Sequence, residues 1–117
     1  MSGTAPRASA RVRRRFPRFP LDVRISVNVL REGEKLAMWG RSNEVGADGI
    51  GATLTAGIEP GEVVWMELSL PLAAVPLRIR AIVRYRDGLR HGFEFLALSS
   101  EQREAVSRVC RILATGG

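Results

Sequence analysis

The sequence contains little cysteine, lysine and histidine, and it has no long apolar run. Cys110 is the single cysteine among 117 residues, which excludes an internal disulfide and a metal site built from several cysteines. No stretch approaches the roughly 20 apolar residues that span a bilayer, so we expect no transmembrane helix. Residues 1–20 also lack the apolar segment of a secretory signal. These absences favour a cytoplasmic protein of one domain.

Acidic residues are absent from the first eighteen positions, which carry six of the 17 arginines. The remainder of the chain holds 12 basic and 12 acidic side chains, so the net charge of +6 belongs to the N-terminus. Residues 1–12 cannot bury enough apolar surface to become ordered, and we expect them to form a flexible basic arm. Because the arginine guanidinium binds phosphate and guanine edges bidentately, an anionic partner is the first hypothesis.

Alternating apolar and polar residues predict a chain built mainly of β-strands. Segments with this pattern are 21–29, 35–41, 63–70, 77–86 and 91–98. The glycine-rich segment 43–51 is expected to be a loop that leads into a further strand. Short strands at this spacing, separated by turn signals such as Asp87-Gly88, are typical of a small antiparallel barrel.

A single helix is predicted, at the C-terminal end near 100–114. Ser99 followed by Gln102 fits a capping box at its start. An apolar stripe at helical spacing is formed by Val106, Val109, Cys110 and Leu113. The predicted fold class is therefore all-β with one C-terminal helix, a six-stranded antiparallel barrel with the helix across one open end.

Two motifs in the N-terminal half resemble the PilZ domain family, bacterial receptors for the second messenger cyclic di-GMP. The family begins with an RxxxR motif just before its first strand, and Arg14 and Arg18 stand at that spacing. It continues with a [D/N]xSxxG turn, which is similar to the segment from Glu44 to Gly49, EVGADG. The ending HGFEFLALSSEQREAVSRVCRIL also looks like the last strand and helix of the family. The resemblance implies a PilZ-like barrel domain over residues 13–117.

The resemblance also implies a site for cyclic di-GMP, with particular residues as its ligands. They are Arg13, Arg14, Arg18, Glu44, Gly46 and Gly49. The arginine pair would meet phosphates and the O6 and N7 atoms of guanine. Glu44 would accept from guanine N1–H and N2–H, and the two glycines would let the backbone approach the ligand. Arg13 resembles the family variants that hold an intercalated ligand dimer.

The second motif departs from the family pattern at two positions. Glu44 stands where the family has Asp or Asn, and Gly46 stands where it has Ser, so only Gly49 matches. A register that starts at Asn43 fits the later positions less well. Restoring the family hydroxyl through Gly46→Ser is expected to leave the affinity equal or to tighten it.

Two functions therefore stand first, and a third is disfavoured. The leading one is a cyclic di-GMP-binding regulatory module that passes the signal to a protein partner. The alternative is a PilZ-like interaction adaptor that has lost nucleotide binding. Nucleic-acid binding is disfavoured, because the body of the chain is neutral and no exposed aromatic residues are expected among its cations. Trp39 and Trp65 are instead expected in the core or at the rim.

Catalysis is not expected of this chain. His91 is alone, with no serine, cysteine or carboxylate constellation visible around it, so a structural role is predicted. The arginines at 78, 80, 84 and 86 are predicted to form a solvated barrel exterior. We expect no enzyme activity, no metal and no cofactor other than the ligand cyclic di-GMP.

Overall fold

The computed structural model describes residues 16–71 and 73–116, which form seven strands and one helix. The elements are β1 (Arg18–Pro20), β2 (Arg24–Arg31), β3 (Glu34–Gly46), β4 (Gly49–Leu54), β5 (Val63–Leu68), β6 (Leu77–Asp87), β7 (Arg90–Leu96) and α2 (Ser100–Ala114). The predicted arm over 1–12 and the predicted ligand residues Arg13 and Arg14 lie outside the described residues.

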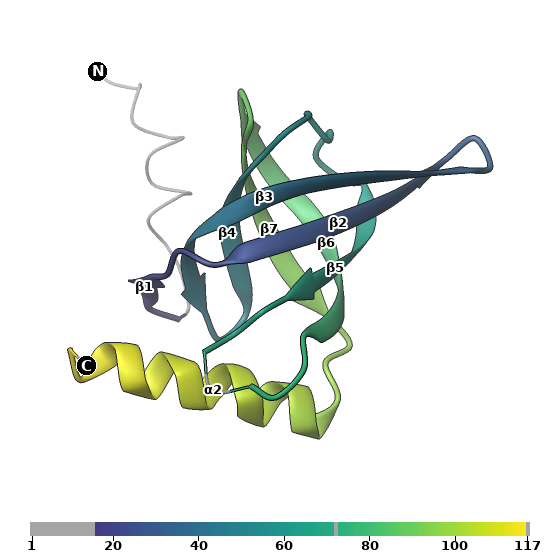
Figure 1. Cartoon of the computed structure of the whole chain (residues 1–117). Helices are drawn as coiled ribbons and strands as arrows, with labels where there is room; N and C mark the ends of the chain where they lie inside the picture. The colour runs from purple at the N-terminus through teal and green to yellow at the C-terminus, as the bar shows by residue number, and fades with distance from the viewer. Residues whose placement is uncertain (1–15, 72, 117) are drawn as a thin grey trace, which may run out of the picture.

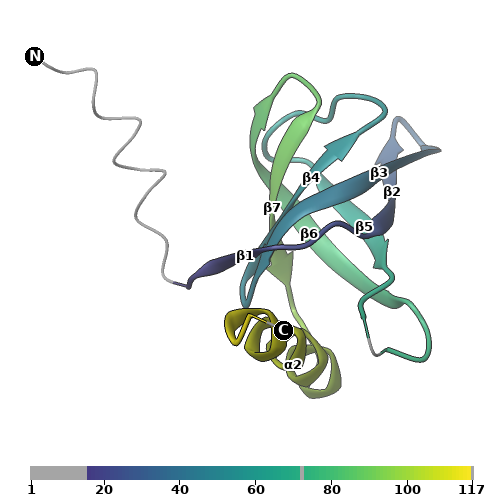
Figure 2. The same cartoon turned by 60° about the vertical axis from the view of Figure 1, so that its left-hand side comes forward.

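Six of these strands close into an antiparallel barrel (Figures 1 and 2). Neighbouring strands pair in the order β3, β2, β5, β6, β7 and β4, and the pairing of β4 with β3 completes the ring. β2 pairs with β3 up to Arg41, and the short β1 pairs with the last residues of β3. The predicted fold class is confirmed, with β1 as an addition to the six barrel strands.

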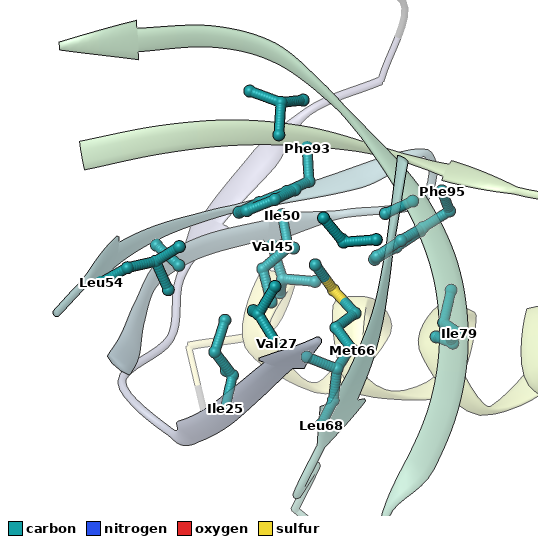
Figure 3. Packing of buried hydrophobic residues seen from close by; sticks show 14 of the residues in the cluster. Ile25, Val27, Val45, Ile50, Leu54, Met66, Leu68, Ile79, Phe93 and Phe95 are labelled. Atoms are coloured by element: carbon teal, nitrogen blue, oxygen red, sulfur yellow. The ribbon is translucent and has the colours of Figure 1, made fainter. Parts of the chain in front are cut away.

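The core fills the inside of the barrel because apolar residues alternate with polar ones along each strand. In β5, Val64, Met66 and Leu68 point inward, and the residues between them are exposed. Figure 3 shows side chains from several strands converging on one apolar cluster, Val45 and Phe93 among them. Full burial of such a side chain stabilises the fold by about 1.5–3 kcal/mol.

The C-terminal helix α2 packs against β1 and β3, and Val106, Val109 and Cys110 are its buried residues (Figure 1). The predicted capping box is present: Ser99 Oγ accepts from the amide of Gln102, and Gln102 Oε1 accepts from the amide of Ser99, both at 3.0 Å. Burial raises the pKa of the Cys110 thiol, which keeps it protonated and unreactive. The predicted helix and its buried face are confirmed.

The prediction of a loop over 43–51 is wrong. β3 continues to Gly46, Ala47 and Asp48 form a two-residue turn, and β4 begins at Gly49. The glycines lie in strands and allow neighbouring strands to pack closely, and they do not form an irregular loop. A Cβ atom on Gly49 would lie 2.1 Å from the carbonyl oxygen of Phe93, so β7 approaches β4 this closely only because that Cβ is absent.

The placement of the two tryptophans also differs from the prediction. Trp39 is 50% exposed and Trp65 is 43% exposed, because each stands at an outward position of its strand. Seven residues separate Trp39 from Gly46, or about 23 Å along an extended strand. Trp39 therefore lies on the barrel wall and does not border the glycine turn.

Candidate ligand site at the β3–β4 turn

Two segments 26 residues apart meet at one end of the barrel. β1 pairs with the end of β3, so that Arg18 stands opposite Gly46 and Phe19 opposite Val45. Pro20, at the end of β1, cannot donate to a ladder, which suits a short edge strand. Arg18 of the first predicted motif is thereby brought against Gly46 of the second.

The guanidinium of Arg18 lies between two carboxylates. Its Nη1 is 3.5 Å from Oε2 of Glu44, and its Nη2 is 3.7 Å from Oδ1 of Asp48. The side chains of Arg18 and Glu44 are 15% and 22% exposed, so their contact is shielded from water more than that of an ordinary surface pair, whereas Asp48 is 36% exposed. At neutral pH the three side chains carry a net charge of −1.

The same cluster retains hydrogen-bonding capacity. Nε of Arg18 and Oδ1 of Asp48 are buried and make no hydrogen bond within the described part of the chain. Leaving such a group unpaired costs about 1–3 kcal/mol. The cluster therefore holds a donor and an acceptor whose hydrogen bonds are not made within it, and because both atoms are enclosed, they become available to a ligand only when Arg18 or Asp48 moves.

The glycines of the second motif are close to β1 and to Glu44. A Cβ atom on Gly46 would lie 2.7 Å from Cδ of Arg18 and 2.8 Å from the carbonyl oxygen of Pro17. On Gly51 it would lie 3.2 Å from Cγ of Glu44. The packing argues against the expectation that Gly46→Ser is neutral or favourable, because any side chain there must displace the backbone that carries Arg18.

A cavity of about 340 Å³ opens beside this cluster, between the turn, β7 and α2. Its wall includes Phe16, Asp48, Arg103 and Ser107. An aromatic ring, a guanidinium and a hydroxyl together provide stacking and hydrogen bonding for a flat polar ring or an anion. Sequence reasoning missed Asp48 because it occupies a variable motif position. It missed Arg103 because the helix comes from the far end of the chain.

Four of the six predicted ligand residues come together in this arrangement. Arg18, Glu44 and Gly46 are in contact or paired, and a Cβ atom on Gly49 would lie 3.3 Å from Nη2 of Arg18. Arg13 and Arg14, the other two, lie outside the described residues.

His91 has structural contacts, as predicted. Its Nε2 accepts from the amide of Ile58 at 3.0 Å, so its Nδ1 carries the proton and donates to the carbonyl of Leu89 at 2.8 Å. Burial lowers the pKa of His91 and keeps the ring neutral.

Over residues 16–71 and 73–116 there is no group of three or more histidine, cysteine, aspartate or glutamate side chains suited to a metal ion. No helix in that part of the chain is long and apolar enough to cross a bilayer.

The chain is thus a closed antiparallel barrel whose short edge strand β1 carries Arg18 against the glycine hairpin. The PilZ domain family model matches residues 12–111, which is most of the chain. The chain belongs to the PilZ domain family.

Solved structures agree on the fold. The PilZ domain with c-di-GMP of YcgR from Escherichia coli is similar with a TM-score of 0.70 and 15% identity, over 89% of this chain and 93% of that one. The PilZ domain of CeSA from a cellulose-synthesizing bacterium gives 0.61 and 16%, over 85% and 96%. The inhibitor of motility MotI/DgrA from Bacillus subtilis gives 0.66 and 18%, over 88% of this chain and 52% of that one. No curated protein matches this chain.

Proposed function

We propose that this chain is a cyclic di-GMP-binding regulatory module whose domain spans residues 13–117 and is preceded by a flexible basic arm over 1–12. The observation that carries the proposal is the position of Arg18 against the turn that contains Glu44, Gly46 and Gly49. These residues belong to the two motifs by which the chain resembles nucleotide-binding PilZ domains, and the similar YcgR domain was solved with c-di-GMP.

Each site residue has a chemical role in the proposal. Arg14 and Arg18 bind the phosphates and the O6 and N7 atoms of a guanine. Glu44 accepts from guanine N1–H and N2–H. Gly46 and Gly49 keep side chains away from the ligand-facing backbone, and Arg13 contributes to holding a second, intercalated ligand molecule.

The charges of the described cluster indicate how binding proceeds. Cyclic di-GMP carries two negative charges, and the cluster of Arg18, Glu44 and Asp48 has a net charge of −1. The ligand therefore depends on the arginines at 13–15 for attraction, and Arg18 exchanges a carboxylate partner for a phosphate. Affinity should fall as ionic strength rises, because salt screens the attraction by the N-terminal arginines.

A specific observation supports the alternative, an interaction adaptor without nucleotide binding. Arg18 already has two carboxylates beside it, and Gly46 lacks the hydroxyl of the family motif. If the internal ion pairs outweigh the ligand contacts, the site stays closed to nucleotide and the barrel acts only through its surface.

Calorimetric titration of the full chain with cyclic di-GMP separates these two functions. We expect saturable binding, no comparable heat with GMP or GTP, and a large loss in Arg18→Ala. The matched control is Arg84→Ala, which removes an exposed arginine paired with Glu94 on the barrel wall. An absence of binding by the wild type at hundreds of micromolar ligand would leave the adaptor as the function.

The remaining expectations belong to the same proposal. The module acts in the cytoplasm, passes its signal to a protein partner, needs no cofactor beyond the nucleotide and has no catalytic activity. The buried His91, engaged by Ile58 and Leu89, supports the last point, because a histidine held in this way is not available as a catalytic base.

A further inference from the structure

The outer wall formed by β3, β2, β5 and β6 exposes aromatic and cationic side chains together. We call this surface the tryptophan wall. It consists of Arg24, Lys35, Trp39, Val63, Trp65, Arg78 and Arg80. Trp39, Trp65 and Val63 are 50%, 43% and 44% exposed, and large apolar side chains that are exposed together on one face are typical of an interaction surface.

Arginines lie over both tryptophan rings of the wall. Arg78 and Arg80 have their guanidinium carbons 4.9 Å and 5.6 Å from the centroid of the Trp65 ring. Arg24 lies 4.7 Å from the centroid of the Trp39 ring. Cation–π contacts at these distances restrict the long side chains, and within the described part of the chain their guanidinium groups make no hydrogen bond. The wall is therefore a preorganised set of donors.

Four other arginines of the barrel exterior are paired with carboxylates, and those of the wall are not. Arg31 pairs with Glu62, Arg41 with Asp22, Arg84 with Glu94 and Arg86 with Glu59. Among the described residues, no carboxylate oxygen lies within ion-pair distance of Arg24, Lys35, Arg78 or Arg80, although Glu67 stands opposite Arg78 in the strand register. With Glu67 counted, this face of the barrel has a net charge of +3 at neutral pH.

A groove of about 440 Å³ lies beside Trp65 in the middle of the wall. Val63 and the Trp65 ring are its exposed apolar lining side chains, and Lys35, Arg78 and Arg80 are its cationic ones. A groove with apolar and cationic lining residues is complementary to an apolar side chain flanked by carboxylates. Tryptophan and arginine are also the residues that contribute most to protein interfaces.

We infer that the tryptophan wall is the docking surface for an acidic segment of a partner protein. One aromatic or aliphatic side chain of that segment enters the groove beside Trp65, and neighbouring aspartates or glutamates bind Arg78 and Arg80. A protein segment fits better than a nucleic acid, because arginines already cover the tryptophan faces on which bases would stack.

The wall and the nucleotide site share β3 but use different parts of it, because Trp39 stands seven positions before Gly46. In the order β3, β2, β5, β6, β7, β4, the strand across the ring from β5, which carries Trp65, is β4, which forms the glycine hairpin with β3. Both sites are therefore accessible at once. The docking proposal holds whether or not the chain binds cyclic di-GMP. An experiment can therefore contradict either proposal without contradicting the other.

Selection from a library of short random peptides displayed on phage tests the proposal on the full chain. Binders are selected on the wild type and depleted on Trp65→Ala. We expect a consensus in which an aromatic or aliphatic residue is flanked by at least a pair of acidic residues. A fluorescent peptide of that sequence should lose at least about fivefold in affinity with Trp65→Ala or Arg80→Gln, as expected of residues central to an interface.

Two matched variants control for general effects. Arg84→Gln removes a neighbouring arginine that is already paired, and Leu89→Ala removes an exposed apolar side chain outside the wall. Both should bind the peptide within about twofold of wild type, which is the change expected outside the energetic centre of an interface. If Trp65→Ala does not fold by circular dichroism, the double variant Arg78→Gln, Arg80→Gln keeps the ring and serves instead.

Four outcomes would contradict the docking proposal. The proposal is overturned if no peptide is enriched, if the consensus is basic, or if the controls reduce binding as much as Trp65→Ala does. It is also overturned if fluorescent single-stranded oligothymidylate binds in a Trp65-dependent manner while acidic peptides do not, since the wall would then be a nucleic-acid surface.

Discussion

The arginines of the β3–β4 turn and those of the tryptophan wall have different kinds of neighbours. At the turn, Arg18 is largely buried between two carboxylates and has an unpaired Nε. On the wall, Arg78 and Arg80 lie on the exposed ring of Trp65, with no carboxylate partner among the described residues. A buried arginine with fixed neighbours suits one small anion, and exposed arginines on a flat ring suit a larger surface.

The neighbours of each arginine therefore indicate the kind of ligand that it binds better than its charge does. Because Arg18 pairs with Glu44 and Asp48, nucleotide binding requires Arg18 to exchange partners. The free-energy cost of this exchange depends on the strength of the two ion pairs. The wall has no such cost, because its cations meet a partner without first releasing a carboxylate. Substitutions at the two regions should consequently separate nucleotide affinity from partner affinity.

The largest expected effect is that of Arg18→Ala on nucleotide binding. Loss of charge-assisted hydrogen bonds should cost about 1.5–3 kcal/mol, or about tenfold to hundredfold in Kd. Calorimetry with cyclic di-GMP measures it, and Arg84→Ala should be unchanged. An equal loss of affinity in both variants would mean that only the total charge of the protein matters. It would contradict a specific role of Arg18 in the nucleotide site.

Gly46→Ser should weaken both the fold and nucleotide binding. The new Cβ meets the Pro17 carbonyl oxygen and the Arg18 side chain, and overpacking of this kind costs about 1–3 kcal/mol. Urea unfolding measures the stability, and calorimetry of the folded variant measures the affinity. Unchanged stability together with tighter binding would show that the family hydroxyl matters more than the packing of β1.

Asp48→Asn should strengthen nucleotide binding modestly. It removes one carboxylate that competes for Arg18 and nearly preserves the shape of the side chain. Because Asp48 is 36% exposed, its pair with Arg18 is of the weak kind, about 0.2–1 kcal/mol, so we expect a gain of about fivefold at most. Weaker binding in the Asn variant would instead make Asp48 a ligand contact.

The smallest expected effect is that of Trp65→Ala on nucleotide binding. The residue lies on β5, on the far side of the ring from β4, so the Kd for cyclic di-GMP should stay within about twofold. The same variant should lose the acidic peptide described above. A parallel loss of both ligands would show that the wall and the turn are one site or are strongly coupled.

Much of the fold was predictable, because it depends on local patterns that tertiary contacts reinforce. The alternation in β5 and β6 and the Ser99–Gln102 capping box all correspond to observed elements. The hairpin at 47–48 was not predictable from glycine content. Glycines in a loop and glycines that let strands approach closely look alike until the facing atoms, such as the Phe93 carbonyl, are known.

The candidate site was predictable in part. Motif spacing identified Arg18, Glu44 and Gly49, but it did not indicate that Asp48 also faces Arg18, because that depends on a two-residue turn. Residue type alone predicts the core or the rim for the two tryptophans, which are exposed. Their outward positions follow from the strand register, which the sequence does not specify for a weakly alternating segment such as 35–41.

One titration tests the separation of the two regions most directly. Cyclic di-GMP is added to the uniformly ¹⁵N-labelled full chain, and amide and indole resonances are followed by NMR. We predict that the amide resonances of Arg18, Gly46 and Gly49 shift until saturation while the indole N–H resonance of Trp65 does not shift. Shifts at the Trp65 indole without change at Gly46 and Gly49 would contradict it.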